Sequence, residues 1–554
     1  MSQGIPGEEM AYTAHIDTFA RDNLPPRRLW PELIFDLPEL QYPARMNCAV
    51  ELLDKMAAVQ GDRPVIHSAI DGKSYTATYE QLLARASQIA HVIREDMKLA
   101  PGTRVLLRGP NNPMMAACWF GVLKAGCIAV ATMPLLRARE LKQIIDKAKI
   151  AAALCDVRLK DEMALAQGQC RDMKQVLYFN DAGPGSLEDR LQRHPAEFRN
   201  VDTAAEDVAL IAFTSGTTGE PKGTMHFHRD VMAMCDAFPR SCLKPGRRDI
   251  FCGTPPIAFT FGLGGMLCFP MRFGASTVLV ERLTAELLLK TIQDFQATIV
   301  FTAPTFYRQM AAQAKHFDLA SLRKCVSAGE TLPDATRQSF KAATGIEIMD
   351  GFGATEMIHI FISHAPERAR RRASGYAIPG YQATVIDEQG RRCPPGVIGR
   401  LAVKGPTGCR YLADERQKDY VITSGAMRGW NLTGDACKMD EDGYFFYQGR
   451  TDDMIISAGY NIAGPEVESA LLLHEAVSEC GVIGVPDQER GQIVKAFVVL
   501  RSGYTINDQM TKGLQDFVKS VIAPYKYPRA IEFVNALPRT ETGKLQRFKL
   551  RQPR

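Results

Sequence analysis

The chain has 554 residues, of which 46% are hydrophobic and 23% are charged, and its formal net charge is +5. This length exceeds what one hydrophobic core usually holds, so we expect at least two domains. The composition is typical of a globular enzyme, and so small a charge excess argues against a nucleic-acid-binding or membrane-bound protein.

Neither a secretory leader nor a membrane span is indicated. The N-terminal segment contains Glu8, Glu9 and Asp17 where a leader would be basic and then apolar. The most apolar window, residues 114–123, is well short of the ~20 residues that cross a bilayer. The fourteen cysteines form no C-x-x-C pair and no Cys/His cluster, so no disulfide framework or zinc site is suggested. We expect a cytoplasmic protein whose cysteines are mostly small buried hydrophobes.

Taken in chain order, the hydrophobic pattern alternates strands with helices. After an arm of about 45 residues, we expect a strand at 65–70 and a long amphipathic helix at 79–97. A βαβ unit follows, with strands at 104–108 and 128–132 and a helix at 112–124 between them. The same alternation continues at residues 139–147 and 151–155 and reappears at 276–280, 286–295, 298–302 and 305–314. Strands separated by helices of this length predict an α/β fold, with a large N-terminal domain of stacked, mostly parallel sheets covered by helices.

The pattern changes twice towards the C-terminus. Short alternating strands between residues 376 and 403 predict a small β-rich subdomain. After residue 449 the pattern starts again, with helices at 466–473 and 514–522 and strands at 480–485 and 494–500. We therefore predict an N-terminal domain of residues 1–449, a hinge at 450–452 and a small mobile α+β domain of residues 453–554.

A glycine- and hydroxyl-rich loop lies between strand-like residues 208–213 and 224–227. Its glycines allow positive φ and turn successive N–H groups toward an anion, and its lysine adds a point charge. Polyphosphate fits this chemistry. The spacing differs from G-x-x-x-x-G-K-[ST] and no helix follows the lysine, which disfavours an ordinary P-loop NTPase. The candidate phosphate-binding residues are Thr214, Ser215, Gly216, Thr217, Thr218, Gly219 and Lys222.

A second candidate nucleotide segment, at residues 350–357, comes after a buried strand. Phe352 offers a flat ring for a base, and Asp350 offers an acceptor for an exocyclic amine. Thr355 and Glu356 would bring a hydroxyl and a carboxylate to the phosphates. Because Mg²⁺ takes carboxylate oxygens together with substrate phosphates, Glu356 is the candidate metal ligand.

Together these segments resemble the acyl-adenylate-forming enzymes, a family that includes acyl-CoA synthetases, adenylation domains and luciferases. The resemblance covers residues 45–550 and implies ATP, Mg²⁺ and coenzyme A as cofactors and co-substrate. It implies adenine and phosphate contacts at Gly329, Glu330 and Gly353, and a ribose site at Asp435 and Arg450. It further implies a hinge at Asp452, a pantetheine channel at Gly459 and a catalytic ammonium at Lys544. At residues 458–460 the family more often has two glycines, which puts the shape of the thiol loop in question.

The acid-binding residues narrow the resemblance. Thr260, Phe261, Gly329 and His359 resemble the aryl pocket of the benzoate-CoA ligases, and residues 12–26 resemble the arm of 2-aminobenzoate-CoA ligases. This implies an aryl-acid:CoA ligase that makes aryl-CoA, AMP and pyrophosphate through an acyl-adenylate. Catalysis would use Lys544, Glu356 and Thr355, and the partner would be an aromatic carboxylic acid.

Several alternatives remain open. One is an acyl-CoA synthetase for another short or medium-chain acid, and another is a stand-alone adenylating enzyme that loads a carrier protein. A nucleotide-binding sensor without turnover is disfavoured, because binding alone has no need of Lys544 on a mobile domain. The sequence carries no signal of oligomeric state, so a homodimer stays an open alternative.

Overall fold

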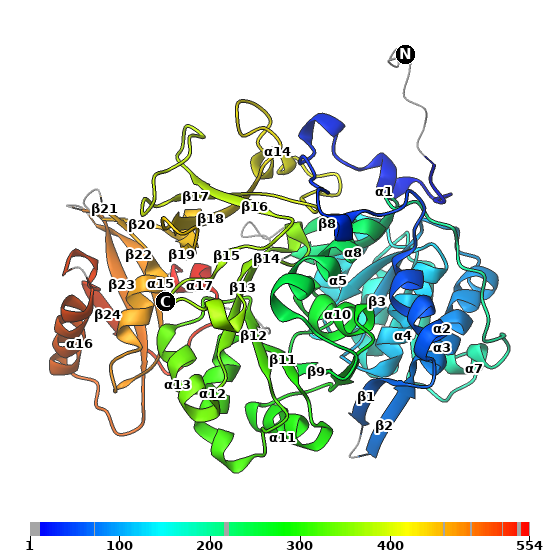
Figure 1. Cartoon of the computed structure of the whole chain (residues 1–554), viewed down its shortest axis with the longest axis horizontal. Helices are drawn as coiled ribbons and strands as arrows, with labels where there is room; N and C mark the ends of the chain where they lie inside the picture. Colours follow the sequence, from blue (N-terminus) through cyan, green and yellow to red (C-terminus); the bar gives the residue numbers. More distant parts are fainter. Residues whose placement is uncertain are drawn as a thin grey trace.

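The computed structural model describes residues 12–70, 73–214, 221–457, 460–487, 490–522, 524–539 and 545–552. The predicted α/β class and the mostly parallel sheets are confirmed. Figure 1 shows two large sheets with their helices, a smaller sheet above them and the C-terminal elements at one side. No described helix is long and apolar enough to cross a bilayer.

The first large sheet has six strands and carries the glycine-rich loop. In spatial order they are β6 (Gln175–Phe179), β5 (Ala152–Asp156), β3 (Arg104–Arg108), β4 (Ile128–Thr132), β7 (Val208–Thr214) and β8 (Lys222–Phe227). All neighbours are parallel except β7 and β8. The apolar window at 114–123 lies in the buried helix α4 (Pro113–Lys124), and the Asn112 side chain caps this helix by accepting from the Met115 N–H at 2.9 Å.

The second large sheet has nine strands. In spatial order they are β15 (Tyr376–Ala377), β14 (Ile360–Ser363), β13 (Ile348–Gly353), β12 (Lys324–Ala328), β11 (Ile299–Thr302), β9 (Ile250–Gly253), β10 (Ser276–Leu279), β1 (Pro64–Ile70) and β2 (Lys73–Thr78). The run from β13 to β1 is parallel, so the carboxyl ends of these strands share one edge.

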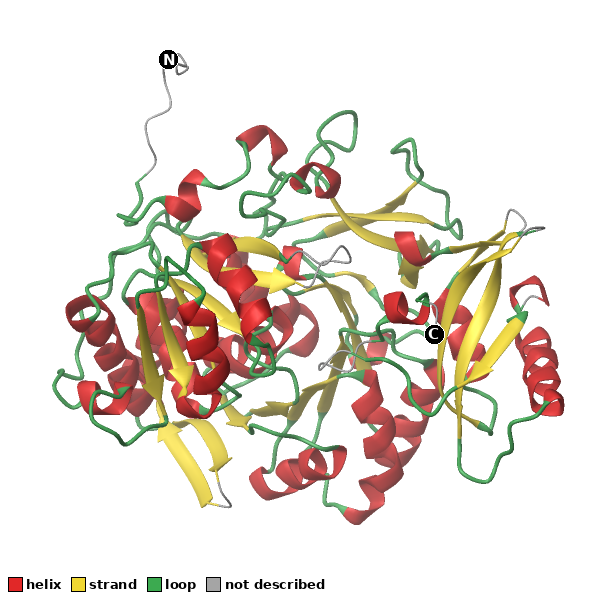
Figure 2. Ribbon diagram, turned by 180° about the vertical axis from the view of Figure 1, so that it is seen from behind, coloured by secondary structure: helices red, strands yellow, loops and turns green. Residues whose placement is uncertain are grey.

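Helices cover the faces of both large sheets (Figure 2). They include α5 (Ala138–Ala148), α6 (Lys160–Gly168), α7 (Leu187–Leu191), α8 (His228–Asp236), α11 (Ala285–Phe295), α12 (Pro304–Gln313) and α13 (Asp334–Thr344). The helix expected at 79–97 is α3 (Tyr79–His91) continued by a π-helical turn, η4 (Val92–Asp96). The apolar spacing predicts the helical path but does not distinguish the two hydrogen-bond patterns.

The β-rich subdomain is an antiparallel sheet that extends further than predicted. Its strands are β16 (Gln382–Ile386), β17 (Gly399–Lys404), β18 (Asn431–Met439) and β19 (Phe445–Arg450). The expected range of 376–403 therefore covers only half of it, because residues 405–430 are largely irregular and separate the two pairs of strands in sequence.

The C-terminal elements have a hydrophobic core of their own. They are η11 (Thr451–Asp453), β20 (Ile455–Ser457), β21 (Tyr460–Ile462), α15 (Gly464–Leu471), β22 (Val477–Asp487), β23 (Gly491–Leu500), α16 (Asp508–Val521), β24 (Ala530–Phe533) and α17 (Arg547–Leu550). Buried Val467, Val494 and Leu514 belong to this core, which is separate from those of the large sheets.

The N-terminal arm lies along the main body. Its described part contains the short helix α1 (Phe19–Asp22), and the Ala14 N–H donates to the Asp207 carboxylate at 2.9 Å. Leu33 then forms a parallel bridge with Gly405, next to the β-rich sheet. The arm thus connects the six-stranded sheet with that subdomain.

Candidate active site

The strands on either side of the glycine-rich loop form an antiparallel pair in which Thr214 faces Lys222. The predicted phosphate residues Ser215, Gly216, Thr217, Thr218 and Gly219 lie outside the described residues. The free edge of β8 pairs with residues 410–412 through a Thr224–Tyr411 bridge. The Lys222 ammonium lies 5.3 Å from the centroid of the Tyr411 ring. Tyr411 is thereby fixed beside the loop, although the sequence did not single it out.

Glu356 lies on a short helical turn, η9 (Thr355–Met357), directly opposite Tyr411. Its Oε1 accepts a hydrogen bond from the Tyr411 hydroxyl at 2.6 Å. Burial and the neighbouring Glu356 charge raise the pKa of Tyr411 well above its usual value, so the phenol stays a proton donor. The turn itself is held by the buried His226, whose Nε2–H donates to the Thr355 carbonyl at 2.8 Å.

A fully buried ion pair next to Tyr411 in the chain holds the contact between Tyr411 and Glu356 in place. Arg410 and Asp230 both have side chains that are 0% exposed, and Nη1 lies 2.8 Å from Oδ2. Burial alone would raise the pKa of Asp230, but the Arg410 guanidinium lowers it, and His226 adds to this effect. Separating the two charges would leave each one buried without a partner, and removing one partner of a buried ion pair costs about 3–5 kcal/mol of stability. The pair therefore holds the segment of Arg410 and Tyr411 in place.

Magnesium ion fits the residues gathered here. Among the described residues Glu356 forms no ion pair, and the group that binds it is a neutral phenol. An anionic carboxylate oriented in this way is the ligand type that Mg²⁺ takes beside phosphates.

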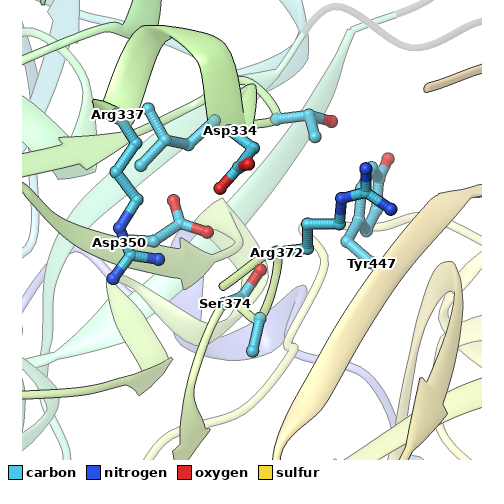
Figure 3. Close-up of a pocket in the computed structure, with 9 residues that line it drawn as sticks. Asp334, Arg337, Asp350, Arg372, Ser374 and Tyr447 are labelled. Atoms are coloured by element: carbon cyan, nitrogen blue, oxygen red, sulfur yellow. The ribbon is translucent and has the colours of Figure 1, made fainter. Parts of the chain in front are cut away.

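A pocket lies between the carboxyl ends of β12 and β13 and the strand β19 (Figure 3). Asp350 and Arg337 line one side of it, and Tyr447 and Arg372 line the other. Burial raises the pKa of Asp350 to about 7, against the lowering effects of Ser374 and Arg337. Asp350, Phe352 and Gly353 belong to β13 itself, which corrects the expectation that this segment follows the strand.

Phe352 lies at the same end of β13 and packs edge-to-face against Tyr447, with ring centroids 5.4 Å apart. Gly329 follows β12 with φ +86°, and a Cβ there would meet nothing within 4 Å. The open space beside Gly329 and the two rings provide a flat, partly apolar surface suited to a base.

The predicted ribose pair is brought together by strand register. Asp435 on β18 and Arg450 on β19 are cross-strand partners, with Oδ1 and Nη1 3.3 Å apart. The same Nη1 donates to the Thr433 carbonyl at 2.8 Å. Gly434, at φ +75°, allows this approach, because a Cβ there would lie 2.5 Å from Arg450 Nη2.

His359 and Phe261, the predicted acid-binding pair, lie in an aromatic cluster. The His359 ring centroid lies 4.6 Å from that of Phe269, 5.7 Å from that of Phe261 and 6.3 Å from that of Phe238. Burial lowers the pKa of His359 to about 3, so the ring is neutral. Its Nε2–H donates to the Phe261 carbonyl at 3.3 Å. Thr260 precedes Phe261 on α9 (Thr260–Gly262) and is buried.

The C-terminal domain reaches this region through charged contacts. Arg539 Nη1 lies 3.3 Å from Glu330 Oε1, and Arg539 Nη2 donates to Glu479 at 2.8 Å. Arg308 on α12 binds the same Glu479 and also donates to the Ser478 carbonyl at 2.9 Å. Lys544 and Gly459 lie outside the described residues. Asp452, the predicted hinge residue, lies on η11, and its side chain is outside the described part of the chain.

Comparison with known proteins tests the resemblance. Residues 53–411 match the AMP-binding enzyme family and residues 466–544 match the AMP-binding enzyme C-terminal domain. A benzoate–CoA ligase of Thauera aromatica is 34% identical over 520 residues, covering 93% of this chain and 97% of the relative. The mitochondrial acyl-coenzyme A synthetase ACSM3 of Rattus norvegicus is 29% identical, covering 93% and 91%.

Solved structures agree with these relatives. The anthranilate CoA ligase AuaEII in complex with anthranoyl-AMP superposes with a TM-score of 0.86 at 32% identity, covering 93% of this chain and 98% of that one. A benzoate CoA ligase from Burkholderia xenovorans LB400 gives 0.83 at 29% identity, covering 92% and 100%. The predicted resemblance is confirmed, and an AMP-forming acyl-CoA ligase that uses ATP and CoA is supported. This chain belongs to the AMP-binding enzyme family.

Proposed function

We propose that this chain is an ATP-dependent aryl-acid:CoA ligase of the benzoate or 2-aminobenzoate type. The observation that carries the aryl assignment is the neutral, buried His359 within a cluster of phenylalanine rings. A flat apolar acid packs well against such rings, whereas a charged or extended polar acid would lose hydration there.

The nucleotide would be held by groups from three elements. Lys222 and the glycine-rich loop would bind phosphates, and Asp435 would accept from the ribose hydroxyls with Arg450 beside it. Phe352 and Asp350 would bind the adenine, together with Gly329, Glu330 and Gly353. Glu356 would hold Mg²⁺, which when bound supplies charge neutralisation at the phosphates. Thr355 would donate its hydroxyl to the same phosphates.

The first half-reaction brings two anions together. The acid carboxylate must approach the α-phosphorus of ATP, so a positioned ammonium stabilises the transition state. Lys544 is assigned this role on the resemblance, with the contacts of Arg539 in support, since Arg539 precedes it by five residues and lies beside Glu330. Rotation about the 450–452 hinge would then admit the CoA thiol past Gly459.

The free nitrogen of His359 favours 2-aminobenzoate over benzoate. A neutral ring carries one N–H, and Nε2 uses it on the Phe261 carbonyl. Nδ1 therefore presents a lone pair, and it has no hydrogen-bond partner among the described residues. An ortho-amino or ortho-hydroxy group on the acid would satisfy this buried acceptor, and leaving it unpaired costs about 1–3 kcal/mol.

An acid panel tests the assignment through CoA-dependent AMP release. We expect 2-aminobenzoate to exceed 2-methylbenzoate in kcat/KM by about tenfold or more, because the methyl group matches the amine in size but donates no hydrogen bond. Equal values for the two would contradict the role of His359. Preference for short or medium aliphatic acids would contradict the aryl assignment as a whole.

Two further measurements separate the remaining alternatives. Pyrophosphate release on adding an aryl acid distinguishes an enzyme from a nucleotide-binding sensor. Incubation of the acyl-adenylate with CoA or with a carrier protein, followed by detection of the thioester, distinguishes a CoA ligase from a carrier-loading enzyme.

A further inference from the structure

A cluster of metal-ligating side chains lies away from the nucleotide site. His91 ends α3, Glu95 lies on the adjoining π-helical turn η4, and His194 follows α7. One ligand atom of each residue lies within 4.8 Å of the others. Figure 1 places α3 and α7 at the end of the molecule opposite the C-terminal elements. None of the residues assigned to the ligase reaction belongs to this cluster.

The contacts of His91 define what its ring nitrogens must do. Nδ1 lies 2.6 Å from Glu95 Oε1, and Nε2 lies 2.7 Å from the Glu197 carbonyl oxygen. Both partners are acceptors only, whereas a neutral imidazole carries a single N–H. His91 must therefore either carry a second proton or present the lone pair of Nδ1 to a cation shared with Glu95.

His194 is oriented in a similar way, although only its Nε2 lies at hydrogen-bond distance from an acceptor among the described residues. Its Nε2 lies 3.0 Å from Asp96 Oδ1, and its Nδ1 lies 3.6 Å from Glu95 Oε2. The two imidazole rings are parallel within 2°, with centroids 5.5 Å apart. Two imidazolium ions stacked in this way would repel each other, whereas two neutral rings sharing a cation would not.

The outer contacts match those of metal-bound histidines. A histidine that ligates a metal through one nitrogen usually donates its other N–H to a backbone carbonyl or a carboxylate. The Glu197 carbonyl and the Asp96 carboxylate are acceptors of these two kinds. They select the tautomers in which both Nδ1 lone pairs point toward Glu95.

We propose that His91, Glu95 and His194 form a site for a divalent transition metal, with Zn²⁺ as its occupant. Two imidazoles and a carboxylate suit zinc, with water as a fourth ligand on the open side. Both rings are mostly buried, while the Glu95 side chain is 56% exposed. In a tetrahedral site, ligand atoms about 2.0–2.1 Å from zinc are about 3.3–3.4 Å apart, so a pair at the 4.8 Å limit of this cluster must close by about 1.5 Å. Rotation of the exposed Glu95 side chain allows this closure.

Such a site would fasten the loop after α7 to α3. That loop already binds α3 through the Gln88 amide, which donates to the His194 carbonyl at 3.1 Å. An ion that binds only the folded chain stabilises it by RT ln(1 + c/Kd), where c is the free ion concentration, so the melting midpoint should rise with Zn²⁺ concentration.

Zinc titration of the chelator-treated, tag-free full-length protein tests the proposal. We compare the unmodified chain with His194→Gln and Glu95→Gln, and with His316→Gln as the matched control, since His316 is an exposed histidine on another surface. The unmodified chain and His316→Gln should each bind one more equivalent of Zn²⁺ than the other two. Bound Co²⁺ should give the visible d–d absorption of a low-symmetry site only in the unmodified chain and in His316→Gln.

Folding of each variant is checked by its unchanged acid-dependent AMP release, since no cluster residue contacts the nucleotide site. Equal zinc stoichiometry in all four proteins would overturn the proposal and leave a cluster of protonated histidines and carboxylates. The absence of Co²⁺ absorption from the unmodified chain would overturn it equally. Glu95→Gln alone suffices for this comparison if His194→Gln proves unstable, because Glu95 is the most exposed of the three.

Discussion

The Tyr411 hydroxyl links the loop strand β8 to the candidate metal ligand Glu356. Replacing Tyr411 with Phe removes the 2.6 Å hydrogen bond but keeps the ring beneath the Lys222 ammonium. We expect kcat/KM for ATP to fall about tenfold and the Mg²⁺ requirement to rise, because a hydrogen bond to a charged group contributes about 1.5–3 kcal/mol. Initial rates at varied Mg²⁺ measure this effect.

Tyr420→Phe is the matched control for this change. The Tyr420 ring packs edge-to-face on Tyr411, with centroids 5.9 Å apart, and its hydroxyl has no hydrogen-bond partner among the described residues. The control should leave the Mg²⁺ requirement unchanged. A similar change in both variants would mean that the hydroxyl of Tyr411 does not orient Glu356.

Asp350 gives the pH dependence of stability a definite sign. Its folded-state pKa is about 7 and its ordinary value is 3.8, so between these pH values the folded chain holds a proton that the unfolded chain has lost. This group's contribution to stability therefore falls as pH rises from about 4 to 7 and is level above. Asp350→Asn removes the titrating group, so the melting midpoint of the variant, relative to that of the unmodified chain, should increase as the pH rises from about 4 to 7. Parallel curves from pH 4 to 8 would show that Asp350 is not perturbed.

At the scale of elements, the β18–β19 hairpin positions the proposed ribose site. Gly434→Ala introduces a Cβ 2.5 Å from Arg450 Nη2 at a positive φ, whereas Gly443→Ala has the same backbone penalty with nothing within 4 Å. Both variants should lose about 1 kcal/mol of stability from the backbone. Only Gly434→Ala should raise the KM for ATP, because only it displaces Arg450 from Asp435. Equal KM values in the two variants would remove Arg450 from the ribose site.

The elements that the sequence predicts best are those whose contacts are local. The predicted strands at 104–108 and 128–132 coincide with β3 and β4, since a buried strand beside a helix leaves a clear apolar pattern. The π-helical turn η4 could not be predicted, because its side chains follow the same apolar spacing as α3.

Contacts between distant segments account for most of what the sequence did not provide. Tyr411 reaches Glu356 only because its strand pairs with Thr224, and no local pattern marks that pairing. The cross-strand register of Asp435 and Arg450 was likewise absent from the sequence, although both residues were identified through the family resemblance. The cluster of His91 and His194 escaped notice for the same reason, since about a hundred residues separate them.

At the scale of the whole molecule, two ion pairs join the C-terminal domain to the rest of the chain, Glu479 with Arg308 on α12 and Arg539 with Glu330. Arg539 also donates to Glu479 within the C-terminal domain, so the two pairs are linked. Arg308→Met keeps the length of the side chain but removes its contacts with Ser478 and Glu479. We expect formation of the acyl-adenylate to slow by about tenfold, more at low salt than at high, because these charged contacts favour the arrangement with Arg539 beside Glu330.

Thioester formation from supplied acyl-adenylate should change little in this variant. Lys315→Met is the control, because Lys315 is an exposed lysine of the neighbouring turn. Equal slowing of both steps by Arg308→Met would indicate general damage in place of a shift between domain arrangements.

Lys544→Ala separates the two steps more sharply. The variant should lose acyl-adenylate formation by about a hundredfold or more, since one positioned group at a developing charge contributes 10²–10³ in rate. Thioester formation from supplied acyl-adenylate should be much less affected. Pyrophosphate release and thioester appearance, measured separately, decide the matter, and equal loss of both would contradict the assigned role.

Arg450 is both the cross-strand partner of Asp435 and the last residue of β19, immediately before η11. A rotation of the C-terminal domain about this point would therefore move Arg450 relative to Asp435 and change the proposed ribose site. In that case the release of AMP and the binding of CoA would be thermodynamically coupled. By thermodynamic reciprocity, CoA should weaken AMP binding by the same factor by which AMP weakens CoA binding.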